Sequence, residues 1–87
     1  MAQQQSQQQP HLTAADRVAQ INKQLDSLDD DVFTLQRDVS DYADIHGWGD
    51  DLVQHGLDQI HVMERRQKEL EEQRRQVRAA TQTTLAS

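Results

Sequence analysis

The stretch VAQINKQLDSLDDDVFTLQRDVSDY, residues 18–42, decides the fold of this chain. Its apolar residues recur at alternating spacings of three and four, which is the repeat of a coiled-coil helix and not of a strand. With Val18 at heptad position a, they occupy a and d in turn. We call this set the seam: Val18, Ile21, Leu25, Leu28, Val32, Leu35, Val39 and Tyr42. The pattern predicts that the seam is the main surface for pairing with another helix.

Composition limits what the seam does within one chain. The 87 residues are 34% hydrophobic, 3% aromatic and 28% charged, which is too little apolar material for a compact globular core. We therefore expect an all-α, elongated coiled-coil protein that takes its core from partner helices. The sequence has no cysteine, so disulfides and thiolate metal sites are excluded and an intracellular, cytoplasmic location is expected.

Local signals divide the chain into segments. Residues 1–12 form a Gln-rich tail that we expect to be disordered, and residues 13–80 form the coiled-coil region. Thr13 followed by Asp16 predicts a capping box at the start of a helix over residues 14–46. A second helical segment is expected over about 50–80, and residues 81–87 are expected to fray.

The Gly47-Trp48-Gly49 break allows two arrangements. Gly47 suits the end of one helix and Asp50 the start of the next, which predicts an antiparallel hairpin. The heptad frame nevertheless continues past the break, placing Val53 at a and Gly56 at d. A single rod bent at the glycines explains that continuity, so the sequence slightly favours the rod over the hairpin.

A second apolar strip lies beside the break. Ile45, Trp48 and Leu52 recur at helical spacing but fall outside the seam. Apolar residues beyond a and d are typical of a helix that contacts two or more neighbours, so we expect these three to bind a partner as well. The alternative for Trp48 is a ring that folds over a loop or stays partly exposed.

Charge and motif content indicate the class of partner. The net charge is -6, and a parallel homodimer would set the acidic or amide residues flanking the seam beside one another with no compensating base, so a hetero-oligomer with other helical proteins is favoured. The basic residues after position 60 are interleaved with four Glu and no aromatic residue, which argues against nucleic acid. No apolar run is long enough to insert into a membrane.

No catalytic or cofactor-binding pattern is present in the sequence. Among the histidines, His46 has a carboxylate, Asp50, at a spacing that would share a metal, and two ligands do not make a site. The adjacent carboxylates of Asp29, Asp30 and Asp31 point around a helix and do not converge on one ion. We expect no enzyme activity, no cofactor and no metal.

The residues from Leu28 to Leu52 resemble the C-terminal helix of one known family. The resemblance is carried by the seam residues from Leu28, by Ala43-Asp44-Ile45, and by Trp48 and Leu52. The family is subunit 1 of the lysosome-related-organelle biogenesis complex, shared with the lysosome-positioning complex BORC. Ala43 stands where the family has Gly, and Gly47 and Gly49 are additions. The resemblance implies a non-catalytic subunit of an endosomal or lysosomal adaptor.

The sequence thus predicts a structural or adaptor subunit of a helical multiprotein complex. Small helical subunits of kinetochore complexes have a similar pattern and are an alternative. The competing class is a self-contained helical hairpin that acts as a regulatory binding module and uses Trp48 at its turn.

Overall fold

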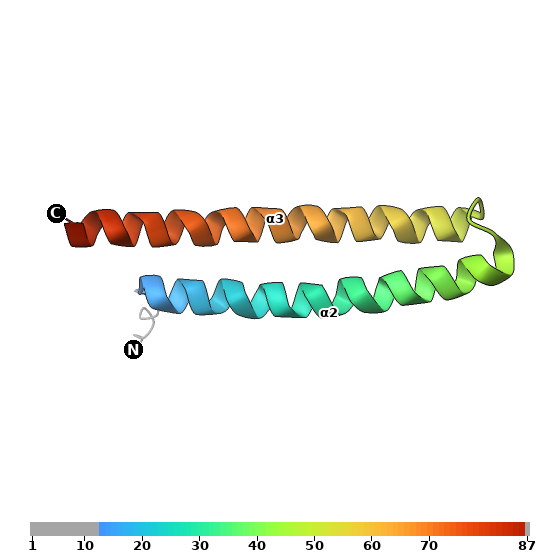
Figure 1. Ribbon diagram of the computed structural model, residues 1–87, viewed down its shortest axis with the longest axis horizontal. Coiled ribbons are helices and arrows are strands. Elements are labelled where there is room, and N and C mark those ends of the chain that lie inside the picture. The colour runs from blue at the N-terminus through green and yellow to red at the C-terminus, as the bar shows by residue number, and fades with distance from the viewer. Residues whose placement is uncertain (1–12, 87) are drawn as a thin grey trace, which may run out of the picture.

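A computed structural model describes residues 13–86 of the chain, with side chains through residue 81. It contains two helices, α2 (Ala14–His46) and α3 (Asp51–Ala86), joined by a short turn. Figure 1 shows the two helices side by side and antiparallel, with the turn at one end. The all-α fold class is confirmed. The expected tail, residues 1–12, and Ser87 lie outside the described residues.

The caps of α2 are those expected from the sequence. The Asp16 amide donates to the Thr13 hydroxyl at 3.0 Å, and the Thr13 amide donates to the Asp16 carboxylate at 3.3 Å, which completes the capping box. At the other end, Gly47 has a φ of 89° and its amide donates to the Ala43 carbonyl at 2.7 Å. This left-handed φ suits glycine, and it stops the helix at His46.

Helix α3 begins one turn later and runs further than expected. The Asp50 carboxylate accepts a hydrogen bond from the Leu52 amide at 2.9 Å, so Asp50 caps the new helix as predicted. The helix then continues to Ala86, past the expected end near residue 80.

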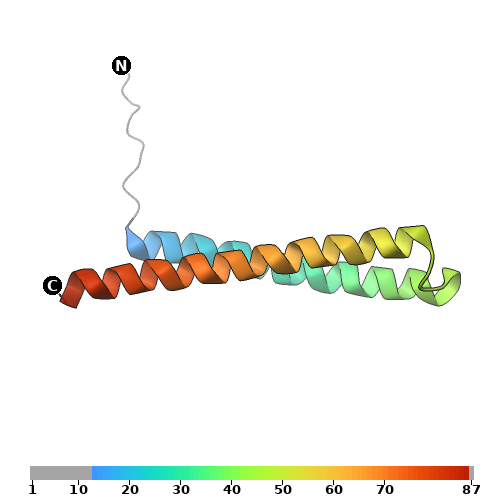
Figure 2. The ribbon, with the colours of Figure 1, turned by 90° about the horizontal axis from the view of Figure 1, so that it is seen from above.

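The core lies along the line of contact between the helices. One cluster of buried residues, near the turn, joins Val32, Val39 and Ala43 of α2 to Val53 and Ile60 of α3. A second cluster, toward the open end, joins Ile21 and Leu25 to Leu70. Figure 2, turned by 90°, shows the helices crossing at a shallow angle, as expected for a coiled-coil pair.

The heptads of the two helices face each other in one register. Gly56 lies against Val39, because a Cβ built on Gly56 would meet Val39 Cγ2 at 2.5 Å. Stepping seven residues back along α2 and seven forward along α3 aligns Val32 with Met63, and a further step aligns Leu25 with Leu70. Each a position therefore meets a d position, which is the pairing of an antiparallel coiled coil.

This arrangement corrects the slight preference for a bent rod. Each helix needs its own three-four repeat to pair, but the phase between the two repeats depends only on the length of the turn. The spacing from Tyr42 to Val53 happens to keep the frame. The local signals at Gly47 and Asp50 were the informative ones, because they end one helix and start another.

On α3, two of the positions that face α2 are occupied by polar residues, and each of these residues has a partner on α2. The Gln67 amide donates to the Asp29 carboxylate at 2.6 Å, and the Arg74 guanidinium donates to the Asn22 side-chain oxygen at 2.7 Å. Both acceptors lie at heptad position e, beside the seam. These pairs would be lost if one helix slid along the other, so we expect them to favour the observed register, which the short turn also constrains.

The first prediction concerns the close approach at Gly56. Alanine in place of Gly56 favours helix by about 1 kcal/mol, but overpacking against the stiff Val39 side chain costs about 1–3 kcal/mol. We expect Gly56→Ala to lower the free energy of unfolding by about 1 kcal/mol, measured by urea denaturation followed by circular dichroism. In a Val39→Ala background the same substitution should stabilise the protein. If Gly56→Ala alone raised the free energy of unfolding, that result would contradict this packing.

The second prediction concerns the polar pairs. Leucine in place of Gln67 and Arg74 would complete the apolar contact between the helices. The free energy of unfolding of the double variant Gln67→Leu/Arg74→Leu, measured by urea denaturation, should therefore be higher by about 1–2 kcal/mol. Because the register constraint is lost, we expect cysteines placed at positions 25 and 70 of this variant to cross-link more slowly than in the otherwise unchanged chain. Equal cross-linking rates would show that the polar pairs do not select the register.

Candidate protein interaction surface

Three large apolar side chains stay exposed around the turn. Ile45 on the last turn of α2 is 79% exposed, Trp48 in the turn is 53% exposed, and Leu52 on the first turn of α3 is 62% exposed. We call these three residues the tip strip. They contrast with the residues that face the partner helix, such as Val53, which is 1% exposed. Exposed apolar residues gathered at one place are typical of a binding surface.

The turn that carries the tip strip is held by several hydrogen bonds. The Asp50 amide donates to the Gly47 carbonyl at 3.2 Å, and the Gln54 side chain donates to the Trp48 carbonyl at 2.7 Å. On α2, the rings of Tyr42 and His46 stack with centroids 4.1 Å apart. The backbone that presents Trp48 is thus fixed before any partner binds, which reduces the entropy lost on binding.

A shallow groove of about 210 Å³ adjoins the tip strip. Its lining combines apolar residues from the contact between the helices near the turn with polar residues of both helices. The lining residues are Leu35, Asp38, Val39, Tyr42, Leu52, Val53, His55, Gly56 and Gln59. Leu52 belongs to both the groove and the tip strip, so the two surfaces are continuous. The buried Gly56 and the partly buried Leu35 and Tyr42 are among the residues that line the groove.

Negative charge is concentrated in the same half of the hairpin. Residues 35–60 contain Arg37 as their one Lys or Arg. Their aspartates, all at least partly exposed, are Asp38, Asp41, Asp44, Asp50, Asp51 and Asp58. Arg37 lies 3.9 Å from the exposed carboxylate of Asp38, which leaves most of this acidic charge unneutralised. The apolar surface near the turn therefore has an acidic border.

The predicted partner-binding residues fall into two groups. The seam packs against α3 from Ile21 to Tyr42, so the helix partner that the seam required is supplied by the same chain, whereas Val18 is half-buried and outside both clusters. The role of the seam in binding a second protein stays a prediction. The residues of the tip strip remain on the surface.

Sequence reasoning missed part of the exposed apolar surface. Val62, 55% exposed, and Phe33, 66% exposed, are not among the predicted partner-binding residues, although both are apolar residues off the seam. Val62 lies at heptad position c, so the same criterion would have found it. The groove at Gly56 could not be found without knowing that the helices pair antiparallel.

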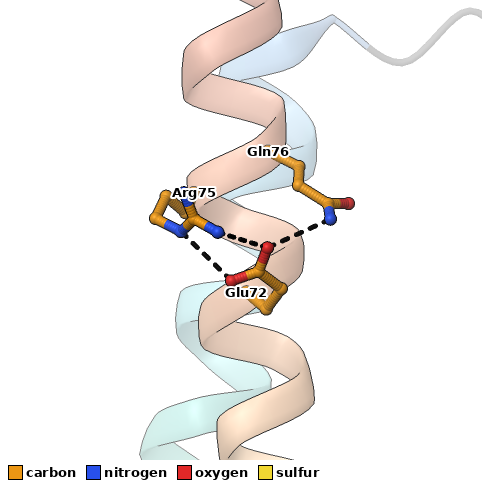
Figure 3. A network of polar contacts seen from close by, with 3 residues as sticks. All are labelled: Glu72, Arg75 and Gln76. Atoms are coloured by element: carbon orange, nitrogen blue, oxygen red, sulfur yellow. Dashed lines mark hydrogen bonds and ion pairs between the residues drawn. The ribbon is translucent and has the colours of Figure 1, made fainter.

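The surface of α3 also carries a small polar network at its C-terminal half. In Figure 3, the Arg75 guanidinium and the Gln76 amide both donate to the Glu72 carboxylate. The hydrogen bond from Arg75 is the main reason that the pKa of Glu72 lies below its usual value, and burial opposes this slightly. These side chains are exposed, so the network supports the helix rather than a reaction.

Two further classes of site were considered for the described residues. Residues 13–81 hold no group of three or more His, Asp or Glu side chains arranged to bind a metal ion. In the same part of the chain, neither helix combines the length and the apolar character needed to cross a membrane.

No family model, curated protein or solved structure matches the chain. The resemblance to the organelle-biogenesis subunit therefore stays a prediction.

The third prediction separates the tip strip from the core. Ile45→Gln and Leu52→Gln remove side chains that are already exposed, so each should change the free energy of unfolding by less than about 0.5 kcal/mol. Leu70→Ala, at a position 1% exposed, should cost about 2–4 kcal/mol. Urea denaturation of the three variants is the measurement. A large loss for either glutamine variant would mean that the tip strip supports the fold.

Proposed function

We propose that this protein is a non-catalytic adaptor: a helical hairpin that binds a partner protein through the tip strip and the adjoining groove. The observation that carries the proposal is the contrast at the turn. The pairing of α2 with α3 buries most of the seam. Ile45, Trp48 and Leu52 remain exposed in and beside a hydrogen-bonded turn.

Energetics indicate how much surface a partner must use. Complete burial of three large apolar side chains contributes roughly 5–9 kcal/mol, whereas association costs about 4–15 kcal/mol in lost freedom. The tip strip alone is therefore too small for a stable complex. A partner that also fills the groove would gain further apolar contact, with Trp48 as its anchor.

Membership in a larger helical assembly is the setting we propose for this surface. A third helix laid beside α2 and α3 would convert the hairpin into a three-helix bundle, as apolar positions outside the seam suggest. An endosomal or lysosomal adaptor complex, or a kinetochore-type complex, would be such an assembly.

The fourth prediction tests the proposed function without assuming a partner. A phage-displayed library of random peptides is selected on the immobilised full chain. Selected peptides should bind the unmodified protein and lose at least tenfold in affinity toward Ile45→Gln/Leu52→Gln, because two apolar contacts are removed.

Phe33→Gln is the matched control, since Phe33 is equally exposed but lies away from the groove. It should retain binding. The proposal fails if no specific peptide is enriched, or if the double variant binds the enriched peptides as well as the control does.

A further inference from the structure

The groove and the tip strip share one side of the hairpin. Asp38 and Ile45 occupy heptad position g on α2, and Leu52 and Gln59 occupy g on α3. The g positions of an antiparallel pair lie on the same side of the seam. Three of these four residues line the groove, which supports this placement. We call this side the g face.

The groove on the g face is lined by residues of both α2 and α3. A third helix commonly packs into the furrow between two paired helices. The groove and the tip strip extend from the level of Leu35 to Trp48, about 20 Å at the helical rise. That length matches about four turns of a partner helix.

The charges beside the g face select the chemistry of that helix. Asp38 lines the groove, and Asp41 is exposed one turn from it on the same helix. The only lysine or arginine in residues 35–60 is Arg37, which is already beside Asp38. An acidic helix would meet uncompensated repulsion here, whereas lysine or arginine flanking an apolar stripe would be complementary.

We infer that the g face binds a basic amphipathic helix of about four turns, with its apolar stripe on the tip strip and groove and its basic flanks against Asp38 and Asp41. This inference rests on the proposed function and specifies its partner. Binding follows the helix-in-groove mode, in which apolar anchors supply affinity and charges supply orientation and selectivity.

A second copy of the chain fits this surface less well. Two g faces brought together would place acidic borders against each other. Three of the six basic residues of α3 are already engaged, with Arg66 paired to Glu69, Arg74 bonded to Asn22 and Arg75 paired to Glu72, and four Glu are interleaved with them. The charge pattern therefore favours a different protein as the partner.

The experiment uses the full chain and a synthetic peptide of about 14 residues with leucine on one helical face and lysine elsewhere. Trp48, the only tryptophan, reports binding through its fluorescence. We expect a blue shift of its emission and saturable binding that weakens several-fold when ionic strength rises from about 0.02 M to about 0.3 M. A peptide with glutamate in place of lysine should not bind.

Variants test the face and the charge separately. Leu52→Gln should lower the affinity for the lysine peptide at least tenfold, and the double variant Asp38→Asn/Asp41→Asn should lower it about three- to tenfold. The matched controls are Phe33→Gln and Asp30→Asn, which alter exposed residues outside the groove. Both should bind as the unmodified chain does. Circular dichroism of every variant verifies that the hairpin is intact.

Several results would overturn the inference. Equal binding of the glutamate peptide would remove the charge selectivity, and equal binding by Leu52→Gln would place the site elsewhere. A dimer in light scattering that is disrupted by Leu52→Gln would show that the occupant is a second copy. If the phage-displayed library yields peptides that need the tip strip for binding but carry no basic residues, the proposed function stands and this inference fails. If the library selects nothing, the proposed function itself fails.

Discussion

Burial of the apolar seam against α3 is the constraint on which the hairpin depends, and the contact between Val39 and Gly56 lies within it. With no side chain at Gly56, the backbone of α3 approaches the Val39 side chain closely in the register that the two heptad repeats share. The buried clusters on either side follow from that register, because each apolar a position then meets a d position. A hairpin built from two helices has little core, so this alignment decides whether the core forms at all.

The polar pairs contribute to the register of the two helices along the rest of the interface. Apolar contacts at three-four spacing are nearly equivalent after a shift of one heptad, so they specify register weakly. The observed pairs of Gln67 with Asp29 and of Arg74 with Asn22 would be lost in such a shift. Stability thus comes mainly from the apolar positions, and we expect the short turn together with these pairs to favour one alignment.

Much of the fold could be predicted from local sequence signals. The start of α2 at Ala14 and its end at His46 follow from the capping box at Thr13 and from Gly47, and the seam follows from its spacing. The pairing of the helices could not be derived in the same way. Continuity of the heptad frame indicated a rod, but frame continuity is not a physical requirement of either arrangement, whereas burial of the seam is. The antiparallel hairpin buries it within one chain. The exposed tip strip was recognised as a surface because its residues do not fit that repeat.

The same pairing that satisfies the seam determines what is left for binding. Once α3 covers the a and d positions of α2, Ile45 and Leu52, which fall outside the repeat, stay largely exposed. Leu52 also lines the groove near the turn, and Gly56 lines the same groove. The residue that lets the helices approach therefore lies beside the exposed surface as well as in the helix contact. A larger residue at Gly56 would disturb the pairing first, because its side chain would meet Val39.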